Sequence, residues 1–405
     1  MGARTASMIS PGERAERLRE VRNLKMARSA HAYVRGSTVK FYEWLEASPG
    51  ALPEGPPVWI CGDCHLGNLG PLADNKGHVA VQIRDLDQTV IGNPAHDLIR
   101  LGLSLASAAR GSDLPGVTTA RILEKLVAGY EAALAGDFDA EGEKAMRPRA
   151  IEGLLDQSVR RRWRHLAAER LDTVEPKVPL GKKFWALTKE ERTALTKLFD
   201  DEAVHGLITG LRSRDDTAPV ALVDAAYWMK GCSSLGRLRY AAMVRVGEGR
   251  DAPLSLIDIK EAVTAAAPRT EGLVMPRDNA VRVVTGAKAL SPNLGQRMIP
   301  ARLLGKAVVL RELMPQDLKL EIERLTPSKA MALAAYLAGV VGKAHGRQMS
   351  VNERAAWLGE LVKARTKASA LDAPSWLWSS VVSLLSIHEA AYLEHCRIYA
   401  LAHAA

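Results

Sequence analysis

The chain has 405 residues, of which 47% are hydrophobic and 25% are charged, and its formal net charge is +9. This composition is typical of a globular protein with room for two or three lobes, and it excludes a disordered or low-complexity chain. The positive charge favours anionic partners such as nucleotide phosphates.

No segment reads as a membrane anchor or an export signal. The longest apolar stretch, 330–342, is too short to span a bilayer, and residues 1–20 are polar and charged. The four cysteines are too few for a disulfide framework in a chain of this length. The densest basic cluster, 160–164, lacks a base-reading motif. We therefore expect a cytoplasmic protein with no membrane or nucleic-acid partner. The oligomeric state stays open.

Residues 58–68 read V-W-I-C-G-D-C-H-L-G-N and allow two incompatible interpretations. The C-x-x-C-H pattern at 61–65 matches a haem attachment site, or half of a redox or zinc motif. The G-D-x-H-x-x-N pattern at 62–68 resembles the catalytic loop of kinase-like phosphotransferases. Haem attachment needs export, zinc needs a second pair of ligands, and a redox motif needs a helix that Gly67 and Gly70 disfavour. We favour the phosphotransfer interpretation, with a redox or metal-binding module as the distant alternative.

The following residues supply the groups that phosphoryl transfer needs. Strands are predicted at 58–60 and 79–83, as a hairpin closed by a polar turn at 71–78. A carboxylate must accept the hydroxyl proton, and an amide with further carboxylates must hold magnesium against the phosphates. The catalytic candidates are Asp63 and His65, and the metal candidates are Asn68, Asp85 and Asp87.

Residues 85–98 resemble the segment that follows the metal-binding aspartate in aminoglycoside and choline kinases. Asn93 can cap the next helix, with Pro94 at its first position. The predicted buried stripe of that helix is Leu98, Leu101 and Leu105. By this resemblance Asp97 is structural and accepts backbone N–H groups of the catalytic loop. Upstream, 26–45 looks helical or mixed with an interruption at Arg35-Gly36, and Arg35 could either reach a phosphate or pair at the edge of the core.

Residues typical of a nucleotide-binding lobe come later in the chain. A hairpin is predicted over 221–246, with a glycine loop at 231–236 whose N–H groups can approach a phosphate. A strand over 254–260 places Leu256, Asp258 and Lys260 on one face. Further strands are predicted at 281–284 and 306–313. The predicted cofactor-binding residues are Gly231, Ser233, Ser234, Gly236, Lys260, Glu312 and Met314, the last at a hinge that would reach adenine.

An amphipathic helix over 327–345 completes the pattern. In ordinary kinases such a helix leads into the catalytic loop, but here the loop lies about 280 residues earlier. The order predicts an α+β, protein-kinase-like two-lobe fold that is circularly permuted. Residues 1–215 would form the first part of a mostly helical large lobe, 216–315 a small antiparallel β lobe, and 316–405 the helical remainder of the large lobe.

This arrangement is similar to that of a bacterial family of unknown function, domain-of-unknown-function family 2252, which belongs with the kinase-like proteins. The resemblance covers most of the chain and implies ATP and Mg²⁺ as cofactors and a hydroxyl group, most simply of a small molecule, as acceptor. Three questions stay open. The protein could be a nucleotide-binding pseudokinase or regulatory module; it could transfer AMP instead of phosphate; and either Glu261 or Glu271 could pair with Lys260.

Overall fold

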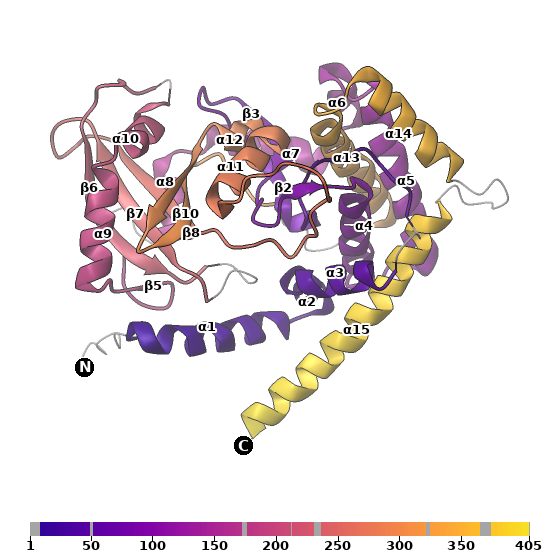
Figure 1. Ribbon diagram of the computed structural model, residues 1–405, viewed down its shortest axis with the longest axis horizontal. Helices are drawn as coiled ribbons and strands as arrows, with labels where there is room; N and C mark the ends of the chain where they lie inside the picture. The colour runs from indigo at the N-terminus through magenta and orange to yellow at the C-terminus, as the bar shows by residue number, and fades with distance from the viewer. Residues whose placement is uncertain are drawn as a thin grey trace.

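The computed structural model describes residues 9–48, 52–171, 176–211, 213–230, 236–320, 325–364 and 374–404. Figure 1 shows an antiparallel sheet at one end of the molecule and a bundle of helices at the other. Short strands from the first quarter of the chain lie between them. The molecule is therefore mixed α and β, and we call its two ends the sheet half and the helical half.

The sheet half is built on six strands in the order β5-β6-β7-β8-β10-β9, and every pairing is antiparallel. The strands are β5 (Phe184–Trp185), β6 (Val220–Trp228), β7 (Arg239–Val246), β8 (Leu254–Glu261), β9 (Met298–Leu303) and β10 (Lys306–Leu313).

Helices cover both faces of this sheet. Residues of α9 (Lys189–Phe199) and α10 (Glu202–Thr209) pack on one face, and residues of α8 (Trp163–Leu171) pack on the other. Because β5, α9 and α10 precede residue 216, the sheet half extends upstream of the predicted 216–315 lobe.

The helical half combines two segments that lie far apart in the sequence (Figure 1). Its helices are α4 (Ala95–Arg110), α5 (Gly116–Ala135), α6 (Ala140–Met146), α7 (Arg149–Arg160), α13 (Pro327–Gly346), α14 (Val351–Lys363) and α15 (Ser375–Ala404). The predicted stripe Leu98, Leu101 and Leu105 is fully buried, and the predicted helix 327–345 is confirmed by α13.

Four short strands connect the two halves, and one prediction about them is wrong. The strands are β1 (Val58–Ile60), β2 (Leu69–Ala73), β3 (Val79–Ile83) and β4 (Val90–Gly92). We expected β1 to form a hairpin with β3, but β1 pairs with β4 and β3 pairs with β2. The 3₁₀ turn η1 (Leu66–Asn68) is followed directly by residues 69–73. The side chains of Leu69 and Leu72 are buried, and this burial favours 69–73 as the strand that pairs with β3.

The predicted strand at 281–284 is also wrong, because these residues lie in α11 (Asn279–Leu290). The Asp278 carboxylate caps this helix by accepting the N–H groups of Ala280 and Val281. Val283 and Val284 are buried in the same core as the helical half. Capping and one-sided burial thus outweigh the strand preference of the β-branched residues. Helix α12 (Pro292–Gly295) follows.

Three helices near the amino end join the halves from below (Figure 1). They are α1 (Pro11–Met26), α2 (Ala30–Gly36) and α3 (Thr38–Glu46), and the break at Ser37 confirms the predicted interruption. The buried Arg14 of α1 lies 2.6 Å from Glu191 of α9 and so fixes α1 to the sheet half. Within the described residues, none of the helices combines the length and apolar character that crossing a bilayer requires.

Close packing of α5 on α13 depends on Gly129. A Cβ atom at this position would overlap the backbone of Ala335. We expect Gly129→Ala to destabilise the fold by about 1–3 kcal/mol, because one of the two helix backbones must shift. Gly359→Ala in α14 is the matched control, since a Cβ there meets nothing within 4 Å. The midpoint of urea unfolding measures both variants, and equal midpoints would contradict the close-packing argument.

Candidate active site

A cavity of about 630 Å³ lies where the sheet half meets the β1–β4 segment. The segment side contributes most of the predicted catalytic and metal residues, and the sheet side contributes Lys260. The predicted residues that line the cavity are Asp63, His65, Asn68, Asp85, Asp87, Lys260 and Met314. The structure therefore brings predicted residues of the β1–β4 segment and of the sheet half together around one cavity.

The loop that carries Asp63 is held by Asp97 at the start of α4. The two carboxylate oxygens of Asp97 accept the backbone N–H groups of Cys61 at 2.7 Å and Gly62 at 3.0 Å. Gly62 has a φ of +73°, and a Cβ there would overlap the backbone of Gln88. The turn before Asp63 therefore needs glycine for both its conformation and its space.

A buried chain of hydrogen bonds continues from Asp97 into the helical half. His345 of α13 places Nε2 3.2 Å from Asp97 and Nδ1 3.0 Å from the hydroxyl of Tyr130 in α5. The indole N–H of Trp357 donates to the same hydroxyl at 3.2 Å. Because these groups are fully or almost fully buried, their geometry is tightly determined.

Asp63 lies at the bottom of the cavity and is only 8% exposed. Arg100, one helical turn after Asp97 on α4, donates from Nε to the Asp63 carboxylate at 3.0 Å. Burial raises the pKa of Asp63, and the charge and hydrogen bond of Arg100 oppose this shift only in part. A carboxylate with a raised pKa is a better proton acceptor than an exposed one.

His65 lies beside Asp63, with Nε2 3.9 Å from its carboxylate. Burial, followed by the charges of Arg35 and Arg100, lowers the pKa of His65 well below 6.5. The ring is therefore neutral at neutral pH. Arg35 itself lines the cavity next to Gly67.

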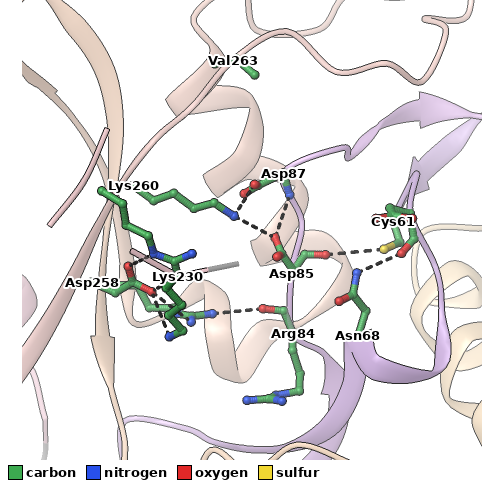
Figure 2. A network of polar contacts seen from close by, with 12 residues as sticks. Cys61, Asn68, Arg84, Asp85, Asp87, Lys230, Asp258, Lys260 and Val263 are labelled. Atoms are coloured by element: carbon green, nitrogen blue, oxygen red, sulfur yellow. Dashed lines mark hydrogen bonds and ion pairs between the residues drawn. The ribbon is translucent and has the colours of Figure 1, made fainter. Parts of the chain in front are cut away.

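Two of the metal candidates, Asp85 and Asp87, contact the Lys260 ammonium, as Figure 2 shows. The Lys260 ammonium lies 3.5 Å from Asp85 and forms a closer ion pair with Asp87. Asp85 is half exposed because it faces the open cavity. Desolvation acts to raise the pKa of Asp85, but the charges of Lys260 and nearby arginines bring it well below its usual value. Asp85 is therefore ionised at neutral pH.

These groups fit a magnesium ion that shares its coordination with phosphates. The amide nitrogen of Asn68 donates to the backbone oxygen of Asp63 at 2.9 Å, which leaves the side-chain oxygen as the ligand atom. Among the residues that the structure describes, no group of three or more His, Cys, Asp or Glu side chains is arranged to hold a metal alone. Magnesium commonly needs only one or two carboxylates besides phosphates and water.

The predicted nucleotide-binding residues are only partly assembled in the described chain. Gly231, Ser233 and Ser234 lie outside the described residues, and Gly236 follows them with a φ of +100°. Met314 lines the cavity, whereas the side chain of Glu312 lies on the opposite face of the sheet, 2.7 Å from Arg214.

Neither glutamate that we considered as the partner of Lys260 takes that place. Glu261 pairs with Lys306 at 3.0 Å and accepts the N–H of Leu238. Glu271 is exposed in the segment between β8 and α11. The aspartates at 85 and 87 are the partners of Lys260 in this structure.

The cysteine pattern at 61–65 does not resemble a reactive or metal-binding site. Cys61 and Cys64 are free thiols with no exposed surface. Burial raises the pKa of Cys61 well above its usual value, whereas redox and metal-binding cysteines need a low thiol pKa. These side chains therefore pack as small apolar residues.

Two features of the site escaped the sequence-based predictions. Arg100 was not singled out, although its position three residues after Asp97 puts it on the same face of α4. A group of cationic residues on the sheet side of the cavity was also missed, because arginines on strands usually face solvent.

The chain matches, over residues 14–398, a family model described as "Uncharacterized protein conserved in bacteria (DUF2252)". Since the match covers almost the whole chain, the protein belongs to this family. Neither the comparison with curated proteins nor the comparison with solved structures gives a match.

Asp97→Asn tests how the catalytic loop is held. The substitution replaces one acceptor oxygen with an N–H donor that faces a backbone N–H. We expect a loss of about 1–3 kcal/mol in unfolding free energy and faster amide hydrogen exchange at Cys61 and Gly62. Asp156→Asn on the exposed side of α7 is the control. Unchanged exchange at the two amides would show that Asp97 does not hold the loop.

One buried and two partly buried histidines predict how stability depends on pH. Burial lowers the pKa of His31, His96 and His388 from 6.5 to about 4. A lowered histidine pKa means that the unfolded chain binds protons more readily, so stability should be complete above pH 6.5 and fall as the pH drops toward 4. Proton NMR of the imidazole rings should show these side chains neutral at about pH 5.5. Midpoints near 6.5 would contradict this assignment.

Proposed function

We propose that this protein is an ATP- and Mg²⁺-dependent phosphotransferase that acts on a hydroxyl acceptor, most simply a small molecule. The observation that carries the proposal is the convergence of Asp63, Asn68 and Asp85 on the wall of one cavity, with the Lys260 ammonium 3.5 Å from Asp85. Phosphoryl transfer depends on positioning and charge, and this set of groups supplies both.

In the proposed reaction the acceptor hydroxyl attacks the γ-phosphorus of ATP. A new P–O bond forms, the bond from the γ-phosphorus to the bridging oxygen breaks, and ADP leaves. Asp63 accepts the hydroxyl proton, and Arg100 keeps its carboxylate oriented. Lys260 contacts the phosphates. Bound magnesium, held by Asn68 and Asp85 with Asp87 nearby, would neutralise charge on the phosphate oxygens.

The order of elements in the sheet half supports this proposal. In kinases a glycine-rich loop covers the phosphates and the phosphate-binding lysine lies on the third strand of the small lobe. Here residues 229–238 connect β6 to β7, Lys260 lies on β8, and α11 follows it in the chain. The spacing from Asp63 to Asn68 also equals that between the catalytic aspartate and asparagine of the kinase loop.

One observation favours a second candidate, a nucleotide-binding regulatory module or pseudokinase. Active kinases pair the strand lysine with a glutamate of the following helix. Helix α11 contains no glutamate, and Lys260 pairs with Asp87 and Asp85 instead. A module of this kind would bind ATP without turnover. Transfer of AMP is a further alternative on the same groups, with attack at the α-phosphorus and release of pyrophosphate.

Replacement of Asp63 by Asn tests the catalytic proposal. We expect native protein to release ADP from ATP and Mg²⁺ in the presence of pooled hydroxyl compounds, and Asp63→Asn to lower this rate by at least about 100-fold because the proton acceptor is lost. ATP binding, measured by calorimetry, should change little. Asp156→Asn is the control for a charge change outside the cavity.

The outcomes separate the candidates. ATP binding without any turnover that depends on Asp63 would exclude the phosphotransferase and favour the regulatory module. Parallel reactions with α- and γ-labelled ATP distinguish AMP transfer from phosphoryl transfer. The circular dichroism spectrum of each variant checks that loss of the Asp63–Arg100 pair has not unfolded the protein.

A further inference from the structure

The sheet side of the cavity carries a group of charged residues that the proposed reaction does not use. Lys230 follows β6, Arg239 begins β7, Asp258 lies on β8, and Arg311 lies directly opposite Asp258 on β10. All four line the cavity. In Figure 2, Lys230 and Asp258 lie on the sheet side of the cavity, away from Asn68.

Positive charge exceeds negative charge at this end of the cavity. Arg239 occupies both oxygens of Asp258, at 2.8 and 2.5 Å. Arg311 and Lys230 approach the same carboxylate only at 3.5 and 3.8 Å. One buried carboxylate therefore faces three cations, and Arg239 alone already satisfies it.

Two further arginines increase the excess of positive charge at this end of the cavity. Arg170 lines the cavity and shares the single carboxylate of Glu169 with Arg161. Arg84 follows β3 on the segment side and lines the cavity as well, where its backbone oxygen accepts a hydrogen bond from Arg311. Within the described residues the Nε of Arg84 has no hydrogen-bond acceptor. We call Arg84, Arg170, Lys230, Arg239 and Arg311 together the cationic wall.

Without a bound anion, the positively charged side chains of the cationic wall repel one another. Burial, and then the neighbouring arginines, lower the pKa of Lys230 well below its usual value, although Asp258 acts against this. Like charges held close together are unfavourable unless an anion accompanies them. A bound anion would remove that cost.

The chemistry of the wall favours phosphate over an aromatic base. Pockets for planar rings are lined mostly by apolar side chains, whereas this surface is charged. Guanidinium groups present paired N–H donors that match the oxygens of a phosphate. The Lys230 ammonium is held 3.9 Å above the ring of Trp228, which keeps it directed along the sheet face.

We propose that the cationic wall binds a phosphate group of the ligand, separate from the phosphates that reach Lys260 and Asp85. The ligand of the cavity then carries a second negative group besides the phosphates at Lys260. This group can belong to an extended polyphosphate or to a phosphate ester on the acceptor. The inference rests on the proposed function for the chemistry at Asp63 and Asp85, but binding at the wall needs no turnover.

Calorimetry with inorganic tripolyphosphate and, separately, glycerol 3-phosphate tests the proposal in magnesium-free buffer. Lys230→Met and Arg311→Gln should each weaken binding about 10- to 100-fold, because each removes a charge-assisted hydrogen bond. Lys363→Met and Arg302→Gln, which change exposed cations outside the cavity, are the matched controls and should bind as the native protein does. Tighter binding of tripolyphosphate indicates a polyphosphate, and tighter binding of the monoester indicates a phosphorylated acceptor.

Three outcomes would overturn the inference. Native protein could bind neither phosphate compound; both wall variants could bind as tightly as native protein; or Lys260→Met alone could abolish binding. If Arg311→Gln fails to fold, Lys230→Met carries the test. Asp63→Asn should bind the phosphates normally, so failure of the proposed catalysis and failure of the wall are distinguishable.

Discussion

The buried carboxylate of Asp97 ties the turn before Asp63 to the helical half. It accepts two backbone N–H groups from the turn before Asp63, and it contacts His345 from a helix about 250 residues later in the chain. Through His345 and Tyr130 the same network reaches α5 and Trp357. The position of Asp63 in the cavity is therefore set by the packing of the helical half. A change in that packing would move the Asp63 carboxylate even though no cavity residue had changed.

The cavity has two chemically different sides. On the side of the β1–β4 segment, Asp63 is kept in place by one arginine, and Asp85 and Asp87 share the charge of Lys260. On the sheet side, cations outnumber carboxylates around Asp258. The carboxylates on one side and the guanidinium groups on the other are the groups on which the proposed phosphate and magnesium binding rests. The two sides come from different halves of the chain. The functional groups of the cavity lie close together because these two halves pack against each other.

Much of the local structure could be predicted from the sequence because local signals agreed. The helix at 327–345 has a one-sided apolar pattern, and the strands at 79–83 and 254–260 are bounded by turns. The errors arose where contacts with residues distant in the sequence determine the secondary structure or the strand pairing. Residues 281–284 have the composition of a strand, but the cap at Asp278 and burial against the helical half make them helical. The strand at 58–60 has no local feature that selects β4 over β3 as its partner.

The sequence by itself determined the spacing from Asp63 to Asn68, the aspartates at 85 and 87, and the strand that carries Lys260, because each depends on residues close together in the chain. Only the tertiary structure decided that Lys260 pairs with those aspartates, that Arg100 holds Asp63, and that five cations gather on one wall. Such contacts join residues up to 227 positions apart. They follow from how the two halves pack, and no local pattern records that packing.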